Sequence, residues 1–258
     1  MNIPIKTERE IEKMRVACRA ASEVLDRVST MVRPGVSTGE IDHAASVLMA
    51  EQSCKSAFLG YRGFPGNVCI SLNEEVVHGI GGNRRIQYGD IVKLDVGVVK
   101  DGWVGDTAAT IPVGIVDEKT QRLLAVTEST LQLAISYAES GRRLGDMCAA
   151  IEEEVVANGY SVVREFVGHG VGRKLHEEPQ IPNYGRRGSG PKLKPGMTIA
   201  IEPMVNLGGA GVRVLADNWT VVTLDAKPSA HFEHTVLVTK GEPEILTWRK
   251  RAFATTQV

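Results

Sequence analysis

The 258-residue sequence lacks the features that mark several special classes of protein. It has no CxxC pair among its four scattered cysteines, which argues against a zinc knuckle or a disulfide framework and predicts free thiols. It has no apolar run long enough to span a bilayer and no signal-peptide core, so we expect a cytoplasmic protein. It has no excess of basic charge, and a net charge of −1 gives no electrostatic reason to expect nucleic acid or an anionic membrane as a partner.

The composition that remains is ordinary for a globular protein. Hydrophobic residues make up 43% of the chain and charged residues 24%. This length can bury a sizeable core, either as one large domain or as two fused halves.

Four segments have the periodicity of helices. Thr7 to Glu10 and Ser37 to Glu40 each have the form of a capping box, and apolar residues at helical spacing follow both. The predicted helices span about 8–31, 40–52, 117–139 and 144–158. Extended segments are predicted at about 56–58, 68–72 and 75–78, and in several runs after Tyr160.

The stretch GDIVKLDVGVVKDGWVGDT, residues 89–107, predicts a β-hairpin. Period-two apolar runs lie on both sides of a turn at Lys100-Asp101-Gly102. Pairing about this turn would put Asp95 and Asp106 roughly opposite each other. Two neighbouring carboxylates repel each other and lose hydration, so such a pair has to share a proton or a cation. The alternative is that one Asp is solvated and the other accepts backbone N–H groups.

The order of the segments contains a repeat. Residues 34–40 return as 140–146 at an offset of 106, and residues 89–95 return as 196–202 at an offset of 107. Each half has two helices, then strands, then an acid at a strand end. A pseudo-two-fold arrangement of the halves would bring four acids together, namely Asp95, Asp106, Glu202 and Glu233.

Four converging acids predict a metal site. They cannot all stay ionised in a partly buried place without several kcal/mol of repulsion and desolvation, and divalent cations relieve this cost. His169 is a fifth candidate, because the glycines around it in VGHGVG let the imidazole reach inward. A buried, hydrogen-bonded histidine is the alternative. Five such ligands suit two transition metals about 3.5–4 Å apart, and Mn, Fe, Co and Zn are all compatible.

The remaining histidines differ in their surroundings. His78 precedes a glycine-rich segment and His176 follows His169 by seven residues, so both are candidates for catalysis, with a surface position as the alternative. His43 is expected on the surface of the second helix. His231 and His234 flank Glu233 and are expected to point to the opposite face of the strand, so neither is assigned a role.

Five stretches together resemble the type I methionine aminopeptidase family: NVCISLNEEVVHGI, GDIVKLDVGVVKDGWVGDT, FVGHGVGRKLHEEPQ, PGMTIAIEPMVN and FEHTVLVT. The similarity covers about residues 6–248. It implies an α/β (α+β) pita-bread fold, a pseudo-two-fold antiparallel sheet flanked by two helix pairs. It also implies one catalytic domain over residues 1–258, with halves at about 7–110 and 115–240. No zinc-finger extension precedes this region and no type II insertion interrupts it, so the short bacterial form is expected.

The resemblance also implies a role for each polar residue. Two divalent ions (Co, Mn, Fe or Zn) would be held by Asp95, Asp106, His169, Glu202 and Glu233. A metal-bridged hydroxide would attack the scissile carbonyl, with Glu202 as the base. His176 would lie near the carbonyl oxygen and His78 would bind the amide nitrogen. Asp95 and its metal would hold the free α-amino group, so that only an N-terminal methionine is removed, and only when the second residue is small.

The resemblance further implies a pocket for the methionine side chain. Its walls would be Tyr61, Phe64, Cys69, His78 and Trp219, with Leu175 where the family often has an aromatic residue. Phe64 stands where a tyrosine is frequent. Without the resemblance, these aromatic residues would be interpreted as ordinary packing. Asn73 and Ser229 match positions that help to bind one monovalent cation in the family.

Two alternatives stay open. A proline-directed relative, aminopeptidase P or prolidase, shares the fold and ligands but generally carries a further N-terminal domain. An inactive relative that binds protein or RNA is the other, although such relatives tend to lose ligands. The expected partners are nascent polypeptide N-termini, with the ribosome as a further candidate, and we expect a monomer with no direct nucleic-acid or membrane partner. The run Arg249-Lys250-Arg251 is interpreted as a solvated tail.

Overall fold

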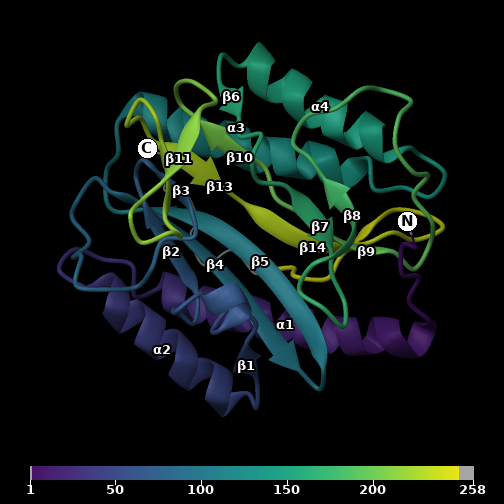
Figure 1. Ribbon diagram of the computed structural model, residues 1–258, viewed down its shortest axis with the longest axis horizontal. Coiled ribbons are helices and arrows are strands. Elements are labelled where there is room, and N and C mark those ends of the chain that lie inside the picture. The colour runs from purple at the N-terminus through teal and green to yellow at the C-terminus, as the bar shows by residue number, and fades with distance from the viewer. Residues whose placement is uncertain (1, 250–258) are drawn as a thin grey trace.

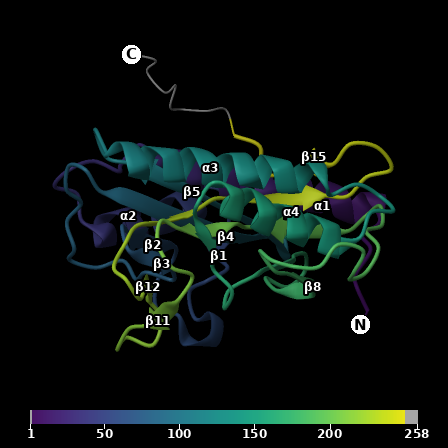
Figure 2. The same ribbon diagram turned by 90° about the horizontal axis from the view of Figure 1, so that it is seen from above.

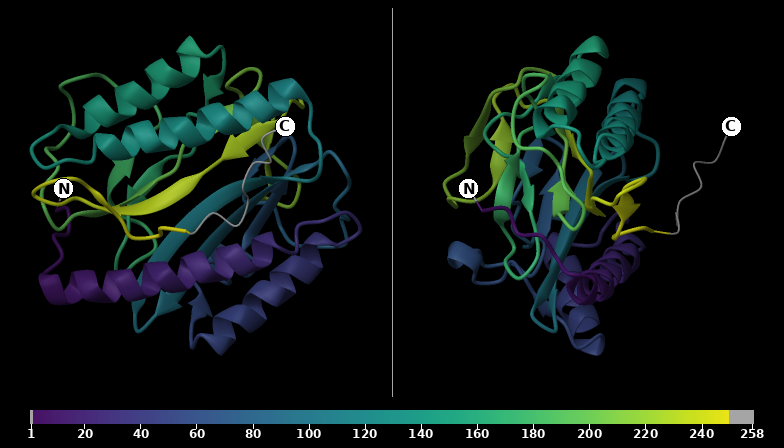
Figure 3. Two further views of the ribbon diagram at one scale, coloured as in Figure 1. Left: turned by 180° about the vertical axis from the view of Figure 1, so that it is seen from behind. Right: turned by 90° about the vertical axis from the view of Figure 1, so that its right-hand side faces the viewer.

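The computed structural model describes residues 2–249 as a curled antiparallel sheet with two pairs of helices (Figure 1). The helices are α1 (Glu8–Ser29), α2 (Thr38–Glu51), α3 (Glu118–Ser136) and α4 (Leu144–Ala157). From behind, the pair α1 and α2 and the pair α3 and α4 lie apart, with long strands passing between them (Figure 3). The prediction of a mixed α/β fold with two helix pairs is confirmed.

Local sequence decides where the helices begin. The N–H of Ser37 donates to the Glu40 carboxylate at 2.8 Å, and the N–H of Glu40 donates to the Ser37 hydroxyl at 3.2 Å. The Glu10 carboxylate likewise accepts the N–H of Thr7 at 2.9 Å. These bonds satisfy N–H groups that a helix leaves free in its first turn. Each predicted helix begins and ends within three residues of the bounds of an observed helix.

The main sheet of the described chain is ordered β1-β4-β5-β14-β9-β7-β8, with β2 beside β4 and β15 beside β14. These strands are β1 (Lys55–Ser56), β2 (Cys69–Leu72), β4 (Ile91–Lys100), β5 (Trp103–Pro112), β7 (Gly168–Gly170), β8 (Glu177–Ile181), β9 (Thr198–Ile201), β14 (Glu233–Leu237) and β15 (Glu244–Ile245). One small sheet contains β13 (Ser229–His231), β10 (Met204–Asn206) and β6 (Ser161–Val162). A second small sheet contains β11 (Val212–Val214), β12 (Val221–Thr223) and β3 (Glu75–Val77). Seen from above, α3 lies at one side of the molecule, and β11, β12 and the edge strand β8 lie at the opposite side (Figure 2).

The centre of the main sheet is symmetric in its strand order. Strands β4 and β5 of the first half meet β14 and β9 of the second half. The loops before α2 and α4 also match, because the N–H of Gly35 donates to the carbonyl of Ile86 and the N–H of Gly141 donates to that of Leu193, each at 2.9 Å. A pseudo-two-fold repeat produces this arrangement.

The core between helix and sheet is close-packed at α1. A Cβ on Gly105 of β5 would lie 2.4 Å from the Ala17 carbonyl oxygen of α1. Only glycine allows this approach, which holds the hairpin firmly against the helix.

Three further predictions can be compared with the structure. The four cysteines are free thiols, as predicted. Among the described residues, no helix has both the length and the apolar character needed to cross a membrane. The prediction of a solvated tail is wrong for Arg249, which is half-buried and lies 3.7 Å from Asp26. Lys250 and Arg251 lie outside the described residues.

Candidate metal centre

A cavity of about 770 Å³ is lined by residues from both halves of the chain. Its lining includes every residue that the resemblance assigned to divalent metal binding, catalysis and the methionine pocket: Asp95, Asp106, His169, Glu202, Glu233, His78, His176, Tyr61, Phe64, Cys69, Leu175 and Trp219. Asn73 and Ser229, assigned to a monovalent cation, are not part of this lining. The fold therefore brings together residues that are widely separated in the sequence.

The hairpin of β4 and β5 carries the first two acids. Its loop contains only Asp101 and Gly102, at φ of 51° and 74°, the left-handed pair of a type I′ turn. Asp106 is consequently opposite Gly97, and Asp95 is opposite Ala108. The two acids are diagonal neighbours on one face, two residues from direct opposition, where the sequence predicted them roughly opposite each other. The even offset keeps both carboxyl groups on the same side of the sheet.

The second half supplies two acids at the junction with the first. Glu233 begins β14 and pairs with Ala108 of β5, so it is the diagonal neighbour of Asp106 across the junction. Glu202 follows the last residue of β9, Ile201, which pairs with His234 of β14. Asp106 and Glu233 are 3% and 2% exposed, so this part of the site is closed to bulk water.

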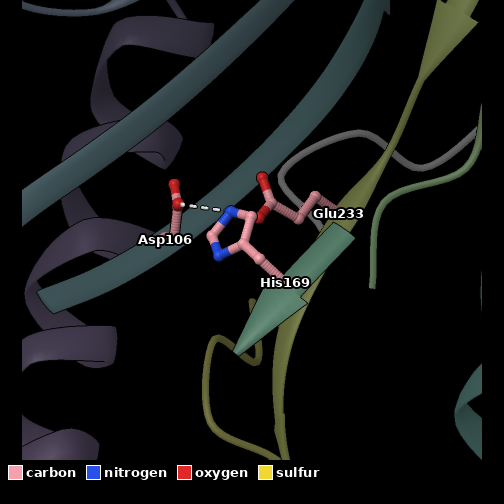
Figure 4. A group of neighbouring side chains, drawn as sticks. All are labelled: Asp106, His169 and Glu233. Atoms are coloured by element: carbon pink, nitrogen blue, oxygen red, sulfur yellow. Dashed lines mark ion pairs between the residues drawn. The ribbon is translucent and has the colours of Figure 1, made fainter. Parts of the chain in front are cut away.

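His169 lies in the middle of β7, between two glycines that have no room for a side chain. A Cβ on Gly168 would lie 2.4 Å from the Ala200 carbonyl oxygen, and one on Gly170 would lie 2.2 Å from that of Glu178. The glycines therefore let β7 fit tightly between β8 and β9. The ring of His169 points toward Asp106 and Glu233, and one ligand atom from each residue lies within 4.8 Å of the others (Figure 4).

The imidazole of His169 has one tautomer favoured by its surroundings. Its Nδ1 lies 3.0 Å from the carbonyl oxygen of Gly170, which can only accept, so Nδ1 carries the proton. The Nε2 lone pair then faces carboxylate oxygens of Asp106 at 3.7 Å and Glu202 at 3.4 Å. Burial and the neighbouring His176 lower the pKa of His169 to about 3. A neutral nitrogen with its lone pair aimed at carboxylates is the arrangement of a metal ligand.

The four acids are strongly perturbed. Burial raises the pKa of Asp106 to about 7. Burial first, and then repulsion from neighbouring acids, raises the pKa of Asp95, Glu202 and Glu233 well above their usual range. Among the described residues, one oxygen each of Asp95, Asp106 and Glu233 is buried without a hydrogen-bond partner. Unpartnered oxygens and mutually repelling acids are relieved by divalent cations, so this donor set fits them.

His78 and His176 stand at different depths of the cavity. His78 is half-buried and follows β3 with a φ of 60°, and its ring lies edge-on to Phe166 at 5.2 Å. Burial lowers the pKa of His78 to about 4. His176 is more exposed, and its Nδ1 lies 2.7 Å from the hydroxyl of Tyr61. Burial, followed by the charge of Arg62, lowers the pKa of His176. Both rings are therefore neutral at pH 7.

An apolar wall adjoins these histidines. Phe64, Cys69 and Leu175 are buried, and the ring of Trp219 meets that of Phe64 at 5.2 Å in an edge-on contact. Tyr61 belongs to a short 3₁₀ turn, Tyr61–Gly63. The side chains of Phe64, Cys69, Leu175 and Trp219 make this part of the cavity apolar, so it can accept an unbranched apolar side chain.

Sequence reasoning missed His231. This residue ends β13, is 1% exposed, and places Nε2 3.6 Å from a carboxylate oxygen of Glu202. Within the described chain neither ring nitrogen has a hydrogen-bond partner. The expectation that it points away from the site was wrong, because residues i and i+2 of an extended segment share a face. His234 does point away, toward Thr247, and His43 is exposed as expected.

Comparison with known proteins agrees with this geometry. Residues 12–240 match the model of metallopeptidase family M24, and the chain belongs to that family. Within it, the chain is 49% identical to methionine aminopeptidase of Escherichia coli (strain K12), covering 97% of this chain and 96% of that protein. It is 48% identical to methionine aminopeptidase 1 of Bacillus subtilis, covering 94% and 98%.

A solved structure extends the likeness to three dimensions. The crystal structure of methionine aminopeptidase from Thermotoga maritima matches with a TM-score of 0.95 at 46% identity, covering 96% of this chain and all of that one. The predicted pita-bread fold and the resemblance to methionine aminopeptidases are confirmed.

Proposed function

We propose that the chain is a metal-dependent methionine aminopeptidase that removes the N-terminal methionine of polypeptides whose second residue is small. The observation that carries this proposal is the junction site itself, where four acids, two buried and two half-buried, and an unprotonated histidine nitrogen meet beside an apolar wall. The likeness to methionine aminopeptidases over nearly the whole chain supports it.

We assign five residues to hold two divalent ions: Asp95, Asp106, His169, Glu202 and Glu233. Their oxygen-rich donor set is compatible with Mn, Fe, Co or Zn. When bound, such ions polarise a scissile carbonyl and lower the pKa of water. The pattern of unpartnered carboxylate oxygens supports this assignment.

Glu202 is the residue we assign to proton transfer. Its side chain is 13% exposed, more than the side chain of Asp106 at 4%, and so it can be reached from the cavity. Its raised pKa suits a carboxyl group that takes a proton from water and gives it to the leaving amine. The Nε2 of His231 lies 3.6 Å from this carboxylate.

The two outer histidines bind the scissile peptide. Neutral His78 can accept or donate a hydrogen bond at the amide nitrogen, and its position beside Trp219 puts it next to the apolar wall. His176 is oriented by the Tyr61 hydroxyl, which leaves its Nε2 free for the carbonyl side of the bond.

The same arrangement explains removal of a single residue. The methionine side chain lies against Tyr61, Phe64, Cys69, Leu175 and Trp219. The free α-amino group meets the half-buried carboxyl group of Asp95, which attracts a cation. An internal peptide bond has no such charge, so only the first residue is cleaved.

The experiment is hydrolysis of Met-Ala-Ser by metal-stripped protein to which Mn, Fe, Co or Zn is returned. We expect release of methionine only with metal, and its loss in Glu202→Gln but not in Glu242→Gln, which changes an exposed loop residue. A folded protein that no metal activates would refute the proposal.

Cleavage of Ala-Pro substrates in preference to Met-Ala-Ser would instead support the proline-directed alternative. Binding of protein or RNA without any hydrolysis would support an inactive relative. For partners, we propose that the chain acts as a monomer in the cytoplasm on nascent N-termini. Sedimentation velocity and co-sedimentation with ribosomes test the monomer and any ribosome contact.

A further inference from the structure

Lys93 is a buried lysine that the proposed reaction does not use. It lies on β4 two residues before Asp95, on the same face of the strand, and is 1% exposed. Lysine is almost never buried to this extent without a specific partner. Its Nζ donates to the backbone carbonyl of Asn73 at 2.7 Å and to that of Ser229 at 3.0 Å.

These two carbonyls belong to the residues predicted to bind a monovalent cation, so the fit of such an ion can be tested here. Backbone carbonyls are suitable ligands for a hard cation. In this chain, however, an amine nitrogen already lies within hydrogen-bond distance of both oxygens. An ion would have to contact the same two oxygens, and the positive charge of the Lys93 ammonium form beside them would repel it. The residues present do not fit the ion.

The two carbonyls come from segments that lead into the site. Asn73 is in the left-handed turn between β2 and β3, at a φ of 50°, and β3 leads to His78. Ser229 begins β13, which leads to His231, and its N–H donates to the Asn73 carbonyl at 3.0 Å. Hydrogen bonds from the Lys93 amine therefore join both segments to β4.

The chemistry of the amine suits this task. Burial lowers the pKa of Lys93 to about 7, while Glu75, Glu74 and Asp90 favour its charged form. Charged or neutral, the amine has the two N–H groups that these carbonyls accept.

We propose that the Lys93 amino group fills the place of the monovalent cation, so that the folded protein needs neither Na⁺ nor K⁺. This inference goes beyond the proposed function and does not depend on it, because stability alone can test it.

The test compares thermal unfolding of the metal-free protein in NaCl, KCl and tetramethylammonium chloride at one ionic strength. We expect wild-type Tm to be the same in all three salts. Lys93→Met keeps the length of the side chain but removes its donors, and leaves two carbonyls unpaired. We expect its Tm in tetramethylammonium to fall by roughly 4–8 °C, and part of this loss to return with Na⁺ or K⁺. Lys55→Met, at an exposed strand lysine, is the matched control and should change little.

Three results would overturn the proposal. The first is a wild-type Tm that falls when Na⁺ and K⁺ are replaced by tetramethylammonium. The second is a Lys93→Met protein as stable as the control. The third is a destabilised Lys93→Met protein that ignores both ions, because the carbonyls would then not form a cation site. If Lys93→Met does not fold, the wild-type comparison decides alone, and ²³Na NMR line broadening provides a second reading of ion binding to the wild type.

Discussion

Removal of divalent metal should make the stability of this protein fall as pH rises above neutrality. The acids Asp95, Asp106, Glu202 and Glu233 all have raised pKa values in the folded chain. Above about pH 6.5 the histidines are largely neutral in both the folded and unfolded states. The buried Lys93, whose pKa is lowered to about 7, loses its proton in the folded chain and acts in the opposite direction, but the four acids that retain protons outnumber this one amine. The folded state then holds protons that the unfolded state has lost, and stability decreases with pH.

The magnitude follows from the number of protons retained. Each one lowers the free energy of unfolding by about 1.4 kcal/mol per pH unit. One retained proton between pH 7 and 8.5 therefore costs about 2 kcal/mol, a fall in Tm of roughly 4–8 °C for a chain of this size. A divalent ion needs ionised ligands, so it should abolish this slope and, at a hundred times its Kd, add about 2.7 kcal/mol.

The assay is thermal unfolding by circular dichroism in EDTA and in excess Mn, at pH 7, 7.75 and 8.5. Asp106→Asn should flatten the slope and weaken the response to metal, whereas Asp101→Asn, in the exposed hairpin turn, should do neither. Measurements stay above pH 6.5 because the lowered pKa values of His169 and His231 act in the opposite direction below it, where protonation of the unfolded chain favours unfolding. A metal-free protein equally stable at pH 7 and 8.5 would refute the reasoning about the four acids.

Three further predictions concern single residues. Gly170→Ala would push β7 away from the carbonyl of Glu178, so it should lower Tm by an amount equivalent to about 1–3 kcal/mol and reduce metal content. Gly241→Ala, where a Cβ meets nothing, is the control, and equal Tm values for the two variants would contradict this prediction. His78→Ala should lower kcat strongly but leave metal content, measured by atomic emission, unchanged, since no contact joins its ring to the acids in the described structure. A loss of metal content in parallel with the loss of kcat would instead make His78 a structural residue. His231→Leu should lower kcat by about 10-fold or more without a matching fall in Tm, because Glu202 loses the polar group that lies 3.6 Å from its carboxylate. His231→Gln should recover much of the rate, and an unchanged kcat in His231→Leu would contradict this role.

The helices and the hairpin were predictable because their signals are local. The capping residues Ser37 and Glu40 satisfy each other within one turn, and the Asp101-Gly102 pair adopts the φ angles that its residue types favour. The exact register was less predictable, since a one-residue difference in loop length moves each acid relative to its partner.

The site was predictable where a motif carried its residues, and less so elsewhere. His169 has glycine neighbours as a signal, whereas His231 is separated from Glu233 by a single residue and its spacing was misjudged. Lys93 gives no signal at all in sequence, because its role depends on two carbonyls that only the folded chain brings to it. Arg249 is similar, since its partner Asp26 lies at the other end of the chain.

The position of β14 has a consequence for folding. This strand follows β5 and β9 in the sequence, yet it lies between them in the sheet. During synthesis, β5 and β9 therefore each have an unpaired edge until β14 is made and pairs with both. The strand that closes this gap also carries Glu233 to Asp106. Completion of the sheet and completion of the acid cluster are thus one event, and a chain interrupted before residue 233 would have neither.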